Sequence, residues 1–268
     1  MKKLNPILAG SLIVIFFISM GCQRVPISGR QQLNILPESQ MLSMALTSYD
    51  DFLKENPVSN DMIKTRMVKT VGANIANAVY TFLKSQNQES RIEGYEWEFN
   101  YVQQDTPNAW CMPGGKVVVY SGLMPYTPNE TSLAVVLAHE IAHAVARHGN
   151  ERMSQGLLMQ FGGLALDIAI EKKPDETKLL FQTAYGITTQ IGIALPYSRL
   201  HETEADKLGL IFMAIAGYNP EAAIDFWSKM AQASGSNAPE FLSTHPSDET
   251  RIKNLKNYLP EALKYYKK

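Results

Sequence analysis

Two histidines four residues apart, with a glutamate directly after the first, are the residues of this chain best suited to catalysis. His139, Glu140 and His143 form the pattern H-E-x-x-H inside Ser132 to Arg147, a stretch without glycine or proline. On a helix, residues four apart point within about 40° of each other, so both imidazoles would project from one face. Two such nitrogens can bind one zinc ion at about 2.0–2.1 Å. Glu140, rotated by about 100°, is placed to act as a base on a zinc-bound water rather than as a ligand.

The motif by itself is also compatible with a core helix that carries two histidines in satisfied contacts. The longer motif with a third histidine is excluded, because Ala146 and Gly149 stand where it needs glycine and histidine. His148 lies about 140° from His143 on a continuous helix, so we expect it to act as a cation or donor near the helix end, away from the metal.

The best candidate for a third ligand is an acidic segment further along the chain. Glu202 and Asp206 are four apart, just before a clear helix at Lys207 to Ala216, so they would share a face. Glu202 can bind the metal while Asp206 accepts the outer N–H of a ligating histidine. An exposed, charged helix start would show the same spacing, and geometry alone does not distinguish the two.

A small sheet and several helices must position these residues. Helical spacing of apolar residues predicts helices at Pro37 to Glu55 and Asp61 to Lys84. Alternating aromatic and polar residues predict a strand with one buried face from Tyr95 to Tyr101, and Val117 to Tyr120 predicts a second strand. Because the pattern beyond Asn129 is helical, the predicted fold class is α+β and mainly helical.

Composition sets outer limits on the class of protein. The 268 residues are 45 % hydrophobic and 19 % charged, which excludes disordered and fibrous chains. A formal net charge of −1 gives no electrostatic basis for nucleic-acid binding, so we expect no nucleic-acid partner. Two cysteines cannot form a disulfide framework.

The N-terminus has the layout of a secretory signal. A positive start, Met1 to Lys3, precedes fourteen mostly apolar residues from Ile7 to Met20, followed by Gly21 and Cys22. The apolar run is shorter than the roughly 20 residues that a comfortable transmembrane helix needs. A cysteine after a small residue resembles the lipobox of bacterial lipoproteins, although Ser19 replaces the usual leucine. An ordinary cleaved signal or an uncleaved anchor, with Cys22 incidental, is the alternative.

This interpretation divides the chain into three parts. Residues 1–21 are the expected lipoprotein signal peptide, residues 22–35 a tether after lipidated Cys22, and residues 36–268 a single metallopeptidase domain. Acyl chains at Cys22 would hold the protein to a membrane without spanning it. Gln23 resembles the residue found in lipoproteins sent to the outer membrane, which places the protein on that membrane's periplasmic face.

Several segments together resemble family forty-eight of the zinc metallopeptidases. The resemblance rests on H-E-I-A-H-A-V-A-R-H-G from His139 and S-R-L-H-E-T-E-A-D-K-L-G from Ser198. It continues in N-A-W-C-M-P-G-G from Asn108 and in S-T-H-P around His245, and so covers nearly all of the mature chain. The membrane-embedded relatives have several spanning helices that this sequence lacks, so it is most similar to the short bacterial lipoprotein members.

The resemblance implies a gluzincin-like metalloprotease domain with one zinc ion per chain and a small β-sheet whose edge strand borders the active-site cleft. The implied roles are zinc ligands for His139, His143 and Glu202, catalytic base for Glu140, and support of a ligand for Asp206.

Two assignments are weaker. His245 is expected to be a transition-state donor or a removable fourth ligand, with a loop histidine that caps a helix as the alternative. Asn108, Ala109, Trp110 and Cys111 are expected to line the cleft, where substrate would add as a further strand through main-chain hydrogen bonds. For Trp110, a place in the core fits the sequence equally well.

The sequence therefore predicts a zinc-dependent endopeptidase that hydrolyses misfolded or misassembled cell-envelope proteins, by attack of a zinc-bound water with Glu140 as general base. The alternative function is a zinc-containing envelope chaperone or binding module with little proteolytic activity. We also hypothesise that Glu151 to Pro196 covers the cleft as a lid or plug.

Overall fold

The computed structural model describes residues 22–161, 166–185, 198–232, 241, 245 and 249–267. The expected signal peptide, and residues 162–165 and 186–196 of the hypothesised lid, lie outside these ranges. The strands and helices are, in chain order, β1 (Cys22–Arg24), β2 (Gln31–Leu33), α2 (Glu38–Glu55), α3 (Met62–Ser85), β3 (Glu98–Val102), β4 (Ala109–Met112), β5 (Lys116–Tyr120), α4 (Glu130–Val145), α5 (His148–Phe161), α6 (Leu166–Lys172), α7 (Pro174–Ala184), α8 (Arg199–Ile215), α9 (Ala222–Gln232) and α11 (Glu249–Leu263).

A three-stranded mixed sheet lies in the middle of the fold, with β5 as its central strand. β5 pairs in parallel with β3, Glu98 opposite Lys116, and antiparallel with β4, Ala109 opposite Val119. All five residues of β5 are buried, because elements cover both faces of the sheet, and its three consecutive valines suit a strand buried on both sides. β4 lies at one edge of this sheet.

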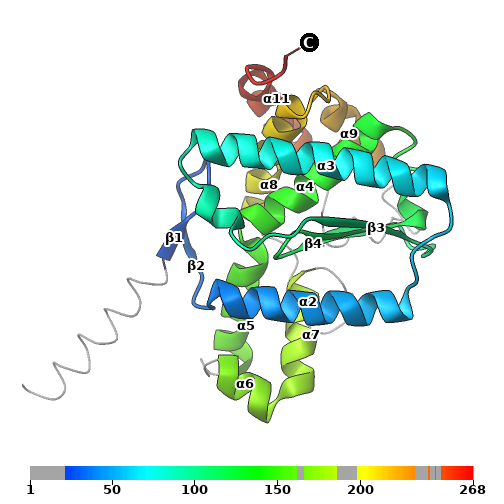
Figure 1. Cartoon of the computed structure of the whole chain (residues 1–268). Helices are drawn as coiled ribbons and strands as arrows, with labels where there is room; N and C mark the ends of the chain where they lie inside the picture. The colour runs from blue at the N-terminus through cyan, green and yellow to red at the C-terminus, as the bar shows by residue number, and fades with distance from the viewer. Residues whose placement is uncertain are drawn as a thin grey trace, which may run out of the picture.

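Helices cover both faces of the sheet. Figure 1 shows α3 crossing above the sheet and α2 crossing below it. One hydrophobic cluster fills the space between the upper face and α3, α4 and α8. A second cluster joins the lower face to α2, α5 and α7. The prediction of a mainly helical α+β fold is confirmed.

α4 is the central helix and has well-defined ends. Asn129 caps its first turn, since the Asn129 side chain accepts a hydrogen bond from the Ser132 backbone N–H and the Ser132 hydroxyl faces the Asn129 backbone N–H in return. The helix ends at Val145, and Arg147 takes a positive φ of 61°. The chain therefore turns before His148, which begins a new helix, α5.

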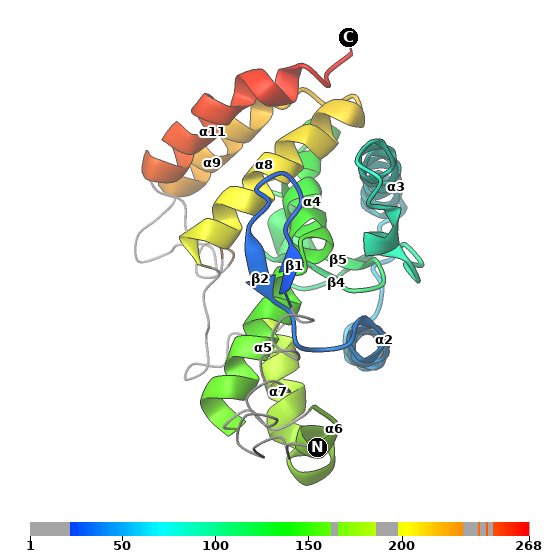
Figure 2. The same ribbon diagram turned by 90° about the vertical axis from the view of Figure 1, so that its left-hand side faces the viewer.

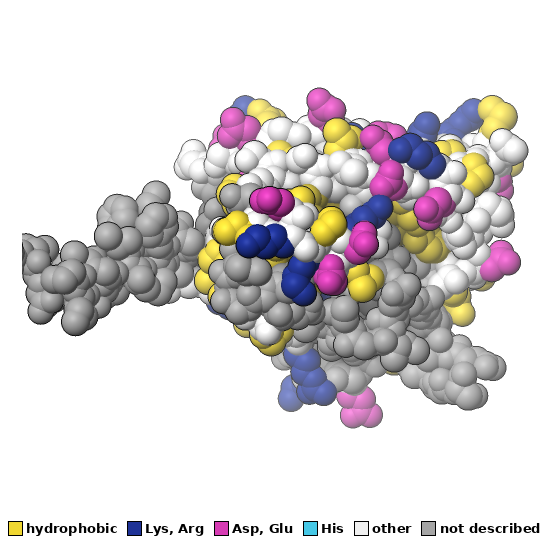
Figure 3. Space-filling model, turned by 90° about the horizontal axis from the view of Figure 1, so that it is seen from below, with side chains coloured by type: hydrophobic (Ala, Val, Ile, Leu, Met, Phe, Trp, Pro, Cys, Tyr) yellow, Lys and Arg dark blue, Asp and Glu magenta, His cyan; other side chains and the backbone are white. Residues whose placement is uncertain are grey.

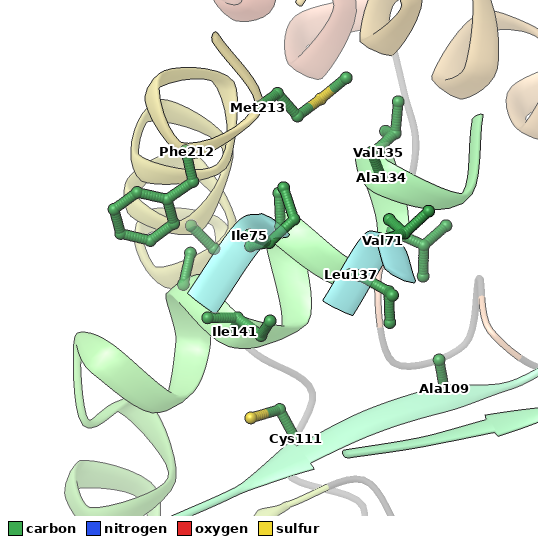
Figure 4. Close-up of a cluster of buried hydrophobic side chains, with 14 of the residues drawn as sticks. Val71, Ile75, Ala109, Cys111, Ala134, Val135, Leu137, Ile141, Phe212 and Met213 are labelled. Carbon is green, nitrogen blue, oxygen red and sulfur yellow. The ribbon is translucent and has the colours of Figure 1, made fainter. Parts of the chain in front are cut away.

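α4 packs closely against α8, and this contact brings the two halves of the site together. Gly209 of α8 lies so near α4 that a Cβ atom there would stand 3.3 Å from the backbone nitrogen of His139. Figure 4 shows Ile141 of α4 among core side chains from α3 and α8, with Cys111 of β4 pointing up from the sheet. The core thus fixes α4 between the sheet and α8.

The residues expected to form a tether are instead an ordered hairpin. β1 and β2 pair antiparallel, with Arg24 opposite Gln31, and Val25 and Gln32 are buried. Figure 2 shows the hairpin lying across α4 and α8, and β2 also contacts α5. Apolar and hydrogen-bonding contacts that the polar sequence did not reveal hold the segment on the domain.

Three helices, α5, α6 and α7, extend below the rest of the molecule (Figure 1). Within the described part of the chain, no helix combines the length and apolar character needed to cross a bilayer. Acidic and basic side chains are interspersed among the coloured residues of the face seen from below (Figure 3).

Candidate metal centre

Three predicted ligands from two helices meet at one point. His139 and His143, one turn apart on α4, place their Nε2 atoms 3.1 Å from each other. Glu202, in the first turn of α8, places Oε2 3.3 Å from His139 Nε2 and Oε1 3.3 Å from His143 Nε2. All three side chains are buried. Burial lowers the pKa of His143 well below its usual value, which favours the neutral imidazole that a metal requires.

His245 joins this group as a fourth potential ligand. Its Nδ1 lies 3.2 Å from His139 Nε2 and 3.1 Å from Glu202 Oε1. One ligand atom from each of the four residues can be chosen so that all lie within 4.8 Å of one another. Donor atoms around a tetrahedral zinc ion with bonds of about 2.0–2.1 Å stand about 3.3 Å apart, so both the spacing and the donor types fit zinc. We call these four residues, His139, His143, Glu202 and His245, the metal group.

Glu140 lies beside the metal group. Its carboxylate is buried, and Oε1 lies 3.4 Å from His245 Nε2. Burial raises the pKa of Glu140 above its usual value. Among the described residues, no donor forms a hydrogen bond with Glu140 Oε1. A buried carboxylate oxygen with this free capacity is suited to accept a proton from a group that enters the site.

Asp206 and Arg251 hold the outer side of the metal group. Asp206 Oδ1 lies 3.0 Å from His139 Nδ1, on the ring edge opposite the Nε2 that faces the other ligands. Arg251 donates to both Asp206 oxygens, at 2.8 and 2.7 Å, and lies 3.0 Å from Glu202 Oε2. Its guanidinium also stacks 3.3 Å from the ring centre of Trp227. Burial raises the pKa of Asp206, but Arg251 and His139 outweigh burial and hold it below its usual value.

The expectation for His148 is met only in part: it is not a member of the metal group and it pairs with Glu204, but it is neither on α4 nor a cation. Because α4 ends at Val145, His148 does not continue the α4 spiral, and its Nδ1 reaches His143 Nδ1 at 2.9 Å. The ring is fully buried, and burial lowers its pKa to about 4, so it is not a cation at neutral pH. The positive φ at Arg147 redirects the chain, and neither composition nor periodicity signals this turn.

The segment expected to bind substrate is divided between the two faces of the sheet. Ala109 and Cys111 belong to the cluster on the α4 side, whereas Trp110 is buried on the α2 side and donates its indole N–H to the Tyr120 hydroxyl at 3.2 Å. Cys111 is a free, buried thiol whose pKa is raised well above its usual value by burial and by the charge of Glu140. Asn108 is buried and precedes β4.

Cys22, the expected lipidation site, is the first residue of β1. Its side chain lies outside the described part of the chain.

The fold and site define a class of protein. A helix carrying H-E-x-x-H, a glutamate from a second helix, and a buried carboxylate beside them on a mainly helical α+β scaffold are the features of a gluzincin-like metal centre.

Sequence comparison identifies the family. Residues 73–259 match peptidase family M48, so the chain belongs to that family. It is 33 % identical over 244 residues to "Mitochondrial metalloendopeptidase OMA1" of Schizosaccharomyces pombe, a match that covers 89 % of this chain and 66 % of the relative. It is 31 % identical over 261 residues to "Metalloendopeptidase OMA1, mitochondrial" of Bos taurus, covering 95 % and 49 %.

A bacterial relative is also similar. The chain is 30 % identical over 209 residues to "Beta-barrel assembly-enhancing protease" of Yersinia pestis, covering 75 % of this chain and 40 % of the relative. The chain thus spans about two thirds or less of the length of each of these three relatives.

Proposed function

We propose that this protein is a zinc-dependent endopeptidase. The observation that carries the proposal is the meeting of His139, His143 and Glu202, within 3.1–3.3 Å of one another, beside the buried carboxylate of Glu140. A site that only binds zinc for structure has no use for that carboxylate. Membership of peptidase family M48 supports the same chemistry.

Each residue then has a defined task. His139, His143 and Glu202 would hold the zinc ion, which when bound polarises a peptide carbonyl and lowers the pKa of a water toward about 7. Glu140 would accept the proton of that water at Oε1, which forms no hydrogen bond with the described residues, and would later return it to the departing amine. Asp206 accepts the Nδ1–H of His139 and so keeps Nε2 directed at the ion.

His245 is assigned as a removable fourth ligand. With Nδ1 3.2 Å from His139 Nε2 and 3.1 Å from Glu202 Oε1, its side chain would occupy a position that a water needs at the ion. For catalysis His245 would have to withdraw, and its Nε2 would then be available as a donor to the transition state. A site in which His245 stays in place as a fourth ligand favours the second candidate function, a zinc-containing chaperone or binding module with little proteolytic activity.

The substrates are proposed to be misfolded or misassembled cell-envelope proteins. The name of the Yersinia pestis relative, a β-barrel assembly-enhancing protease, supports the bacterial envelope as the place of action. Extended substrate would pair with the edge strand β4, near Asn108 to Cys111, through main-chain hydrogen bonds that depend little on sequence. Lipidation at Cys22 would hold the enzyme on the periplasmic face of the outer membrane.

The variant Glu140→Gln tests the proposal, because it keeps the volume of the side chain and removes the base. We expect equal zinc content by elemental analysis and a loss of casein cleavage of about 10²–10⁴-fold. Full zinc with no cleavage by the unmodified protein would support the chaperone instead. Equal cleavage by both proteins would contradict the role of Glu140.

A further inference from the structure

A second buried cluster of histidines and carboxylates lies next to the metal group, on α5 and α8; α8 also carries Glu202 of the metal group. Near its start, each of α5 and α8 carries a histidine followed three residues later by a glutamate: His148 and Glu151 on α5, and His201 and Glu204 on α8. The pairs cross between the helices, with His148 Nε2 3.1 Å from Glu204 Oε2 and His201 Nε2 3.0 Å from Glu151 Oε2. The two imidazoles stack with ring centres 4.5 Å apart. All four side chains are buried.

Arg30 of the N-terminal hairpin connects the two carboxylates. Its Nη1 and Nη2 each donate to Glu151 at 2.7 Å, and its Nε and Nη2 donate to Glu204 at 3.0 Å. The Ser28 hydroxyl also donates to Glu204. One guanidinium therefore compensates two buried negative charges and joins the hairpin to α5 and α8. We call Arg30, His148, Glu151, His201 and Glu204 the arginine cluster.

The arginine cluster touches the metal group through one hydrogen bond, between His148 Nδ1 and His143 Nδ1 at 2.9 Å. The ionised carboxylate of Glu204 can only accept, so His148 carries its proton on Nε2 and its Nδ1 is an acceptor. His143 must then donate from Nδ1, which leaves its Nε2 lone pair directed at His139 and Glu202.

We propose that Arg30, acting through Glu204 and His148, fixes the tautomer and ring orientation of His143, so that the N-terminal hairpin is a positioning element of the metal centre. The inference rests on the proposed zinc site. It gives both histidines of α4 a partner on the ring nitrogen that faces away from the metal position: Asp206 for His139, and the His148–Glu204–Arg30 chain for His143. Arg30, Glu204 and His148 are thus positioning residues.

Zinc affinity of the full chain, measured by competition with a chromophoric chelator, tests the proposal without relying on activity. We expect His148→Phe to weaken zinc binding about 10–100-fold, the range found when an outer partner of a ligand is lost. Arg30→Met should weaken it in the same direction. The double variant should bind zinc no more weakly than His148→Phe alone, because both residues act through one path.

Arg24→Met is the matched control. It removes the same charge from the same hairpin, but the Arg24 side chain is exposed and forms no hydrogen bond or ion pair with the described residues. We expect it to bind zinc as the unmodified protein does. Glu204→Gln, which keeps the shape of the side chain, provides a second route if Arg30→Met does not fold. Substitution with Co²⁺ adds a spectroscopic readout: Arg30→Met or Glu204→Gln should alter the visible ligand-field bands, and Arg24→Met should not.

Unchanged zinc affinity and Co²⁺ spectra in folded His148→Phe would overturn the proposal. Arg30→Met and Glu204→Gln could instead lose thermal stability while their zinc affinity and Co²⁺ spectra stay unchanged. Arg30 would then have only a structural role, and the proposal would also be overturned. Failure of the proposed function would give a different result. The unmodified protein would then bind zinc tightly but cleave no substrate, and the variants would still bind zinc more weakly.

Discussion

The metal group and the arginine cluster are built from the same residue types but differ in where positive charge comes from. Both are buried, both contain two or more histidines and at least one glutamate, and both use the first turns of α8. In the arginine cluster, the Nε2 atom of each histidine contacts a carboxylate: His148 contacts Glu204, and His201 contacts Glu151. Arg30 forms ion pairs with both carboxylates. In the metal group, histidine nitrogens converge on one another at 3.1–3.2 Å.

That difference indicates what separates a binding site from a structural ion-pair network. Acceptor atoms that face one another are stable only around a shared proton or a cation. The arginine cluster carries its cation covalently on the chain, so its charges are compensated as soon as the domain folds. The metal group has Arg251 beside Glu202 Oε2, but its histidine nitrogens still face one another, and a divalent ion would supply the positive charge between them.

The largest contrast is expected between Glu202→Gln and Glu204→Gln, matched substitutions two residues apart. Glu202 belongs to the metal group, so its loss should weaken zinc binding by more than about 100-fold. Glu204 acts through His148, so the loss there should stay within about 10–100-fold. Chelator competition measures both values. Equal losses would remove the distinction between the two clusters.

The next effect concerns stability. Arg30→Met leaves the buried carboxylates of Glu151 and Glu204 without their shared cation, and breaking a buried ion pair in this way costs about 3–5 kcal/mol of unfolding free energy. Urea denaturation of the zinc-free protein measures it. The triple variant Arg30→Met, Glu151→Gln, Glu204→Gln should recover part of the lost unfolding free energy, because no uncompensated charge remains. If the triple variant is even less stable, the packing of these side chains, rather than their charge, determines the stability.

A smaller effect is expected in the pH dependence of stability. Burial raises the pKa of Glu151, but hydrogen bonds from Arg30 and His201 outweigh burial and hold its pKa well below the usual value. A carboxyl with a depressed native pKa stabilises the fold above its unfolded pKa of about 4.5, and this stabilisation disappears as the pH falls toward the native value. The stability difference between the unmodified protein and Arg30→Met should therefore narrow from pH 6 to pH 3 in urea titrations. If the difference in unfolding free energy stays constant from pH 6 to pH 3, Glu151 is not the group whose ionisation stabilises the fold.

The sequence predicted the parts of the fold and site that depend on local periodicity. Helical spacing located α2 and α3 closely, and the glycine- and proline-free stretch around His139 is α4. The four-residue spacing of Glu202 and Asp206 agrees with the common face on which both residues contact His139.

What the sequence did not predict depends on contacts between distant segments. Arg30 lies in a polar stretch that resembles a linker, and only the folded chain brings it to Glu204, 174 residues away in the sequence. The turn at Arg147 has no glycine to mark it, which is why His148 was placed on the wrong helix. The repeated spacing of histidine and glutamate at 148/151 and 201/204 was a usable signal for the arginine cluster.

The smallest effect is expected at a surface ion pair, which serves as the reference for both buried clusters. Lys178 of α7 lies 2.8 Å from Asp51 of α2, and both side chains are at least one-third exposed. Water and salt screen such a pair, and each partner is well solvated when the other is removed. Lys178→Met should therefore leave the urea midpoint and the zinc affinity unchanged within error. A loss comparable to that of Arg30→Met would show that the contact between α2 and α7, rather than burial of charge, sets the stability of this region.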